Sequence, residues 1–166
     1  LVSMAVLKAG IGQSEAALAL ARQAVELDPL NPATQFDLGL IYRFSNHLPD
    51  AERQFRRAIE LSPGGQRYRT FLAIALAGLR RFDEAEALAR NEPDELSRMF
   101  VHGLVAAGRG DRARLLATIA ELESKRPTLG QLGDYSAYLS SMRGAAGDFD
   151  GAFKELNLTR ESRDPS

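Results

Sequence analysis

The sequence predicts an all-α fold, a stack of about five antiparallel helix pairs. Three observations support this prediction. Alanine and leucine are abundant, whereas aromatic residues make up only 7% of the 166 residues. A pattern of small residues recurs after about 34 residues, and prolines lie near the expected ends of helices. Because strands prefer β-branched and aromatic residues, this composition favours helices.

The repetition is clearest between the segments AALALARQAVELDPLNP and AERQFRRAIELSPGG. Four positions of the first segment correspond to four positions of the second, always at the same distance along the chain. They are Ala17, Ala21, Ala24 and Pro29 in the first segment and, in the same order, Ala51, Phe55, Ala58 and Pro63 in the second. A fixed interval of this length indicates a helical repeat, in which each unit is one helix pair.

Residues 32–65 form the most complete unit, with Leu38, Gly39, Tyr42, Ala51, Phe55, Ala58 and Pro63 at its diagnostic positions. This pattern resembles the tetratricopeptide repeat, which has a small residue at its eighth position and an aromatic residue at its eleventh. That repeat also has alanine at its twentieth and twenty-seventh positions and proline at its thirty-second. The resemblance covers the whole chain, strongly over residues 1–90 and loosely thereafter, and it implies a right-handed α-solenoid.

Three further units continue the pattern with shifted spacing. The third contains Leu72, Ala73, Leu76, Phe82 and Ala85, the fourth Gly108, Ala113, Ala117 and Ala120, and the fifth Leu139, Ser140, Gly147, Phe149 and Ala152. Ala113 follows Ala85 too soon for the constant interval, so the fourth unit is expected to be about six residues early. We therefore expect one array, which is part of a longer protein, with repeats at about 1–31, 32–65, 66–92, 93–127 and 128–166.

The predicted helices span residues 1–10, 13–28, 32–45, 48–61, 66–79, 82–91, 94–107, 110–125, 130–145 and 149–161. Their ends follow from capping residues, with Pro32 and Pro93 in first turns and Pro29, Pro63 and Pro127 after helix ends. The shifts in spacing predict the weakest geometry at residues 90–94 and 126–132.

Small residues are expected where the two helices of a pair approach closely. Gly39 on the first helix and Ala51 on the second are predicted to lie at this contact, and Ala58 to meet the next repeat. Glu52, beside Ala51, is predicted to face water. No pair buries its apolar face alone, so each depends on its neighbours.

Composition and charge argue against several classes of function. The formal net charge is −1, which gives no broad field for nucleic-acid binding. The chain has no cysteine, and therefore no disulfide or thiolate zinc site. No apolar run reaches the roughly 18 residues that cross a bilayer, so we expect no membrane contact by this segment. A cytoplasmic location is expected, or a periplasmic one if a signal sequence precedes Leu1.

The sequence also predicts no catalytic residue, cofactor or metal site, and hence no enzyme. The two histidines, His47 and His102, lie far apart in the sequence, without a nucleophile or carboxylate at a recognisable spacing. The tripeptide Arg109-Gly110-Asp111 is interpreted as the turn between two helices, with Asp111 as the cap of the second.

The resemblance implies a concave groove lined by the first helix of each pair. Carried onto this chain, the groove positions beyond Val2, Val6 and Glu95 are Phe36, Asp37, Leu40, Phe44, Arg67, Thr70, Phe71, Ile74, Arg98, Met99 and His102. Some members of the family hold a terminal carboxylate with lysine and asparagine at such positions. Here Val2 and Val6 stand in their place, and Asp37 would repel a carboxylate. In the alternative interpretation, Phe36, Leu40 and Phe71 simply pack between adjacent first helices.

The leading hypothesis is a non-enzymatic module that binds a protein or peptide segment in this groove, with self-association as a further mode. The final unit resembles the closing repeat of arrays at the C-termini of bacterial signalling proteins, which favours a regulatory region. The alternative is a structural scaffold of a secretion, pilus or envelope assembly. A helical-repeat RNA-binding protein is disfavoured by the nearly neutral charge.

Overall fold

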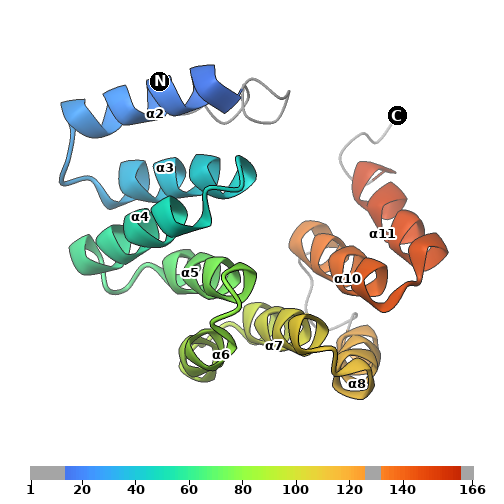
Figure 1. Cartoon of the computed structure of the whole chain (residues 1–166). Coiled ribbons are helices and arrows are strands. Elements are labelled where there is room, and N and C mark those ends of the chain that lie inside the picture. Colours follow the sequence, from blue (N-terminus) through green and yellow to red (C-terminus); the bar gives the residue numbers. More distant parts are fainter. Residues whose placement is uncertain (1–13, 126–131, 162–166) are drawn as a thin grey trace. The chain divides into compact units, whose positions relative to one another are not determined.

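The computed structural model describes residues 14–125 and 132–161, and within these ranges the chain forms helices and no strand (Figure 1). The helices are α2 (Ser14–Leu27), α3 (Pro32–Phe44), α4 (Leu48–Leu61), α5 (Gln66–Gly78), α6 (Phe82–Arg90), α7 (Glu95–Arg109), α8 (Arg112–Ser124), α10 (Leu132–Ala146) and α11 (Phe149–Glu161). The predicted all-α fold class is therefore confirmed. The predicted helix at residues 1–10 lies outside the described residues.

Local capping chemistry explains why the helices begin where they do. The side chain of Asn31 accepts hydrogen bonds from the backbone N–H groups of Ala33 and Thr34, and Pro32 occupies the first turn of α3. Asp111 accepts a hydrogen bond from the Arg114 N–H at 3.0 Å and so caps α8, as predicted. Pro93 lies outside α7, because Asp94 is the capping residue of that helix.

The chain divides into two compact units, Leu1–Leu88 and Ala89–Ser166, with α6 ending just beyond the boundary. In the first unit α3 packs against α2 and α4, and α5 packs against α4 and α3. In the second unit α7 packs against α8, α10 packs against both, and α11 packs against α10. The boundary lies close to the predicted shift at residues 90–94. A single array of five repeats stays a prediction.

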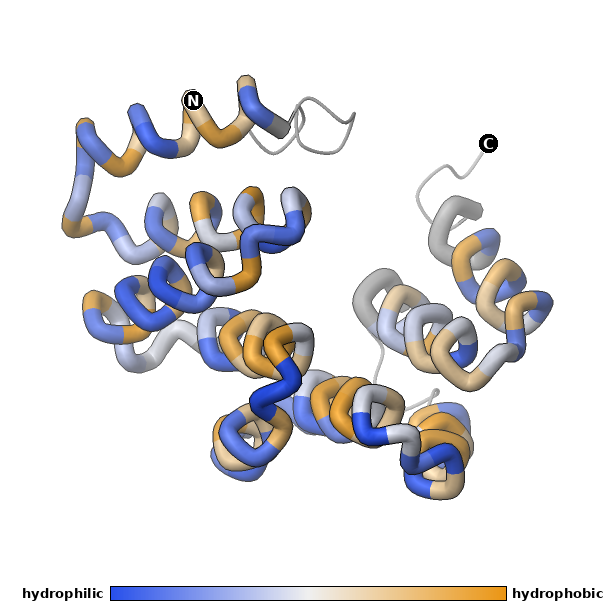
Figure 2. Tube along the Cα trace, viewed as in Figure 1, coloured by the Kyte–Doolittle hydropathy of each residue, from blue (hydrophilic) through white to orange (hydrophobic). Residues whose placement is uncertain are grey.

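Four second helices bury residues at the spacing i, i+4, i+7, which places them on one helical face. The buried triplets are Ala17, Ala21 and Ala24; Ala51, Phe55 and Ala58; Ala85, Ala89 and Glu92, the last just beyond the end of α6; and Leu115, Ile119 and Leu122. The first three triplets keep one constant interval, whereas the fourth begins four positions early. Figure 2 shows the corresponding recurrence of apolar residues along the helices.

The predicted face of α8 is wrong. Ala113, Ala117 and Ala120, expected at the buried positions, are all exposed. Leu115, Ile119 and Leu122 lie in the core instead, because the larger side chains remove more apolar surface from water than the alanines would. The fourth unit is therefore about four residues early rather than six.

The contact between α3 and α4 depends on Gly39. A Cβ atom at this position would lie 2.6 Å from Cε1 of Phe55, which is shorter than any ordinary carbon contact. Phe55 is fully buried, so its ring has little room to move away. Ala51 is also fully buried, but the Phe55 ring rather than Ala51 lies against Gly39.

The prediction that Glu52 faces water is also wrong. Its side chain is only 14% exposed and forms ion pairs with Arg56 at 2.9 Å and Arg81 at 2.7 Å. Arg81 also pairs with Glu84 at 2.6 Å. The hydrogen bonding from Arg81 lowers the pKa of the Glu84 carboxyl below its ordinary value. The sequence pattern could not reveal this network because Arg81 lies 29 residues from Glu52.

Replacing Ala51 by leucine is expected to lower the free energy of unfolding by about 1–3 kcal/mol, because the enlarged side chain has no space in the closed contact. The matched control is Ala19→Leu on the exposed side of α2, which should change stability by less than about 0.5 kcal/mol. Urea denaturation followed by circular dichroism measures both. If Ala51→Leu and Ala19→Leu lowered the free energy of unfolding equally, Ala51 would not lie in a closed contact.

The orientation of α8 predicts a second contrast. Leu115→Ala should cost about 2–5 kcal/mol because it empties a buried site. The same change at Leu116, which is 45% exposed, should cost less than about 1 kcal/mol. A larger loss for Leu116→Ala in thermal or urea unfolding would favour the face that the alanine pattern predicted.

Candidate functional site

The predicted groove residues belong to three helices, which we describe within their own units. In the first unit, α3 carries Phe36, Asp37, Leu40 and Phe44, and α5 carries Arg67, Thr70, Phe71 and Ile74. In the second unit, α7 carries Arg98, Met99 and His102.

Phe36 is a packing residue and is only 7% exposed. Its ring centroid lies 5.6 Å from that of Phe55, 5.0 Å from that of Tyr68 and 5.2 Å from that of Phe71. The Phe36–Phe71 pair is edge-on, one of the favoured aromatic geometries. Thr70, on the neighbouring helix, is also buried. The contact between Phe36 and Phe71 fits the alternative interpretation, in which Phe36, Leu40 and Phe71 pack between adjacent first helices.

The remaining six positions of the first unit keep accessible surface, and we call them the α3/α5 face: Asp37, Leu40, Phe44, Arg67, Phe71 and Ile74. The three on α3 follow the spacing i, i+3, i+7, and the three on α5 follow i, i+4, i+7, so each set occupies one side of its helix. Phe44 is 59% exposed, which is unusual for an aromatic side chain.

Charged groups accompany the apolar side chains of this face. Burial raises the pKa of the half-buried Asp37 carboxyl, and the positive charge of Arg67 on the neighbouring helix partly offsets that rise. The guanidinium carbon of Arg67 lies 5.6 Å from the centroid of the Phe71 ring. Arg43 lies 5.5 Å from the same centroid and 4.6 Å from that of Phe44. Such cation–π contacts hold cations beside an apolar surface.

Sequence reasoning missed Arg43, because it is not one of the groove positions that the repeat implies. Its place next to Phe44 gives no local signal of the contact with Phe71, which belongs to a different helix. The contact forms because α3 and α5 pack together.

In the second unit, Met99 and His102 line a pocket of about 290 Å³ between α7 and α8. Arg114, Thr118 and Glu121 of α8 also line it, and Nη2 of Arg114 lies 3.4 Å from Nδ1 of His102. Sequence reasoning missed these α8 residues because it placed the wrong face of that helix toward the core. The spacing of Leu115, Ile119 and Leu122 is the signal that could have found them.

Arg98 does not line this pocket, unlike Met99 and His102, the other two predicted groove residues of α7. Its Nη1 donates a hydrogen bond to the backbone carbonyl of Glu92 at 2.7 Å, which ties the side chain to the segment before α7. Glu92 is itself buried, and its carboxylate accepts a hydrogen bond from the N–H of Asp94 at 3.2 Å. Arg98 therefore helps to shape the start of α7.

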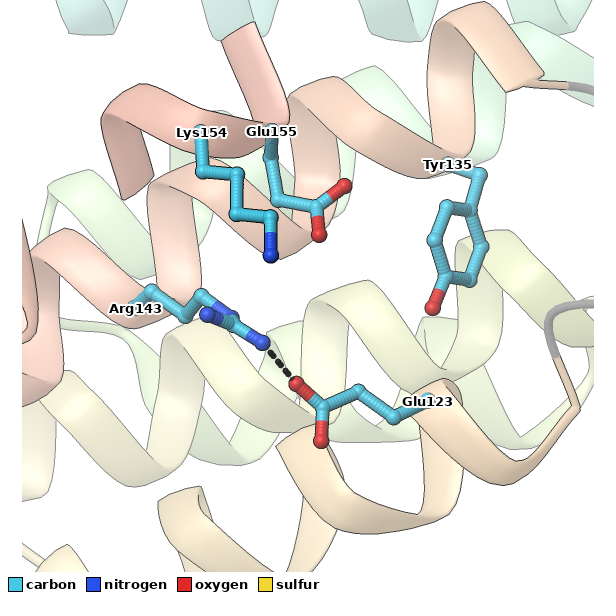
Figure 3. Close-up of a pocket in the computed structure, with 5 residues that line it drawn as sticks. All are labelled: Glu123, Tyr135, Arg143, Lys154 and Glu155. Atoms are coloured by element: carbon cyan, nitrogen blue, oxygen red, sulfur yellow. Dashed lines mark hydrogen bonds and ion pairs between the residues drawn. The ribbon is translucent and has the colours of Figure 1, made fainter. Parts of the chain in front are cut away.

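A second pocket of about 260 Å³ lies among α8, α10 and α11 (Figure 3). Its lining residues are Glu123, Tyr135, Arg143, Lys154 and Glu155. Arg143 pairs with Glu123 and, at 3.2 Å, with Asp148, while the Tyr135 hydroxyl donates to the carbonyl of Leu122 at 3.3 Å. The pocket thus contains charges of both signs that largely satisfy one another, and the sequence did not predict it.

The described residues offer little for catalysis. No group of three or more His, Cys, Asp or Glu side chains among them is arranged to hold a metal ion. His47 is exposed, with its ring centroid 6.2 Å from that of Tyr42. None of the helices in residues 14–125 and 132–161 has the length and hydropathy needed to span a bilayer.

Comparison with known proteins gives matches at the level of structure. No family model and no curated protein sequence matches the chain. A tetratricopeptide repeat protein from Parabacteroides merdae aligns with a TM-score of 0.67 and 14% identity over 95% of this chain. The present chain spans 62% of the length of that protein.

Two further solved structures are similar over nearly the whole chain. PilW, a type IV pilus biogenesis factor, aligns with a TM-score of 0.61 and 19% identity over 95% of this chain and 89% of its own. PilF of Pseudomonas aeruginosa aligns with a TM-score of 0.63 and 16% identity over 96% and 73%. Together with the helix-only architecture and the buried triplets, these likenesses show that the chain has the fold of tetratricopeptide-repeat proteins.

Proposed function

We propose that the chain is a non-enzymatic interaction module whose α3/α5 face binds a protein segment. The observation that carries this proposal is the exposure of Phe44, together with the half-buried Leu40, Phe71 and Ile74 on the same two helices. Apolar residues that stay accessible on neighbouring helices provide anchoring positions for an amphipathic segment.

The charges on this face select the chemistry of the segment. Arg43 and Arg67 lie over aromatic rings, where a carboxylate of the segment would gain attraction to both guanidinium groups. Asp37 carries the opposite charge, and it lies on the side nearest Arg67. We therefore propose a segment with apolar anchors and acidic residues placed toward Arg43. A clamp for a terminal carboxylate is not proposed.

In the second unit, Met99 and His102 form a separate candidate contact at the α7/α8 pocket. Arg114 and Glu121 give this pocket both signs of charge, so it suits a polar side chain rather than an apolar anchor. We propose that Arg98 lies at the border of this candidate contact.

The wider role follows only from analogy of fold. The proposed setting is a regulatory region of a bacterial signalling protein in the cytoplasm. The second candidate is a scaffold in a pilus or envelope assembly, favoured by the likeness to the pilus biogenesis factor PilW. Co-purification of the intact protein from its own cells distinguishes them, because a scaffold would be recovered with assembly components.

The binding proposal is tested with ligands selected from a displayed library of random short peptides. The selected peptides should combine apolar and acidic residues. A Phe44→Ser and Ile74→Ser double variant should bind them more weakly by about 2–4 kcal/mol, because central apolar anchors contribute most of the binding energy. Fluorescence titration measures the affinity, and circular dichroism confirms that the variant stays folded.

The matched control is Leu116→Ser, which removes an exposed apolar side chain from α8 and should leave the affinity unchanged. Phe36→Ser is unsuitable for this test, because loss of its three ring contacts should unfold the first unit. Undiminished affinity in a folded Phe44→Ser and Ile74→Ser variant would move the binding site away from the α3/α5 face.

A further inference from the structure

Helix α11 exposes three large apolar side chains on one side. Phe149 is 65% exposed, Phe153 is 67% exposed and Leu156 is 49% exposed. Their spacing of i, i+4, i+7 aligns them along the helix, and we call them the α11 stripe. It is the spacing at which the second helices of the earlier pairs bury their own triplets.

The same helix also has a buried side, which packs against α10. Ala152 and Glu155 are 9% and 3% exposed, and they lie on a different side of the helix from the stripe. A helix at the surface of a soluble protein normally turns charged and polar residues to the solvent. Because α11 turns phenylalanines and a leucine outward instead, this surface has the character of an interface.

The other exposed large apolar residues do not form such a row. Among the described side chains, Leu27, Leu30 and Leu116 are single exposed residues of an ordinary kind, and Phe44 belongs to the α3/α5 face. An aligned set of three large exposed apolar residues on one helix is not ordinary.

Two charged residues border the stripe on one side, Asp150 and Lys154. Neither forms an ion pair with another residue in the described part of the chain. Lys154 extends over the pocket that Arg143 and Glu123 line, and its ammonium group carries no dashed contact in Figure 3. Both charges are therefore available to a molecule that covers the stripe.

We propose that the α11 stripe binds the stripe of a second copy of this chain, with the two helices antiparallel about a two-fold axis near Phe153. In this arrangement Phe153 meets its own counterpart, and Phe149 meets Leu156 of the second copy. Asp150 then lies opposite Lys154 of the second copy. One register therefore satisfies the apolar contacts and both symmetric charge pairs, as an isologous interface requires.

A parallel arrangement fails on charge. A parallel two-fold pair would place Asp150 and Lys154 of one copy on the opposite side of the stripe from those of the second copy, so neither residue would meet an opposite charge. The charge pattern of α11 thus selects the antiparallel pairing. This interface uses no residue of the α3/α5 face and does not depend on the function proposed for that face.

The first test measures the mass of the chain against concentration by sedimentation equilibrium. The unmodified chain should form a dimer, and Phe153→Glu should weaken dimerisation by at least about 30-fold, because it buries a charge at the centre of the interface. Leu116→Glu, a matched change on α8, should dimerise like the unmodified chain. Circular dichroism should show unchanged helicity, since both positions are exposed.

The second test exchanges charges. Asp150→Lys and Lys154→Asp should each weaken dimerisation by about tenfold, and the double exchange should restore it, because the opposite charges again face each other. The chain has no cysteine, so Leu156→Cys, on the stripe itself, reports orientation. An antiparallel pair keeps the two thiols apart, whereas a parallel pair would bring them together and oxidise to a disulfide-linked dimer.

Three results would overturn the proposal. They are a chain that stays monomeric at all concentrations, a Phe153→Glu variant that still dimerises, and a disulfide-linked dimer of Leu156→Cys. The first would assign the stripe to a different protein or to another segment of the same polypeptide. The Phe44→Ser and Ile74→Ser variant should dimerise normally, which separates failure of this proposal from failure of the peptide-binding one.

Discussion

The close approach of α3 to α4 at Gly39 is the constraint on which the first unit depends. The Phe55 ring occupies the space where a side chain at this position would lie. From there it reaches Phe36 at 5.6 Å and Phe71 at 6.1 Å, measured between ring centroids. One buried aromatic ring therefore joins three helices, and its position follows from the absence of a single methyl group on α3.

This packing decides which residues of α3 remain accessible at the surface. Because Phe36 turns toward α4 and α5, Asp37, Leu40 and Phe44 occupy the side of the helix that keeps accessible surface. Arg43 lies over the rings of Phe44 and Phe71 and adds a positive charge to this face, and part of both rings stays accessible. Apolar side chains and cations therefore lie side by side on the surface that the proposed segment would cover.

The second unit follows the same helix geometry with different side chains. Leucine and isoleucine replace the alanines of the earlier buried triplets, and α8 turns a different face inward to bury them. The pockets beside α8 and the ion pairs of Arg143 arise from that orientation. At the end of the described chain, α11 pairs with α10 and still presents apolar residues outward, so this unit leaves apolar surface that its own helices do not cover.

The sequence by itself determined the helices of the described residues, most of their ends to within two residues, and the first two buried triplets. These depend on caps such as Asn31 and Asp111 and on the helical period, which act between residues a few positions apart. The tertiary structure decided the orientation of α8, the burial of Phe36 and the ion pairs of Glu52. On α8 the spacing of Leu115, Ile119 and Leu122 competes with that of the alanines, and packing against residues distant in sequence decides between the two faces. The partners of a charged side chain such as Glu52 are likewise set by residues distant in sequence, because several partners are within its reach.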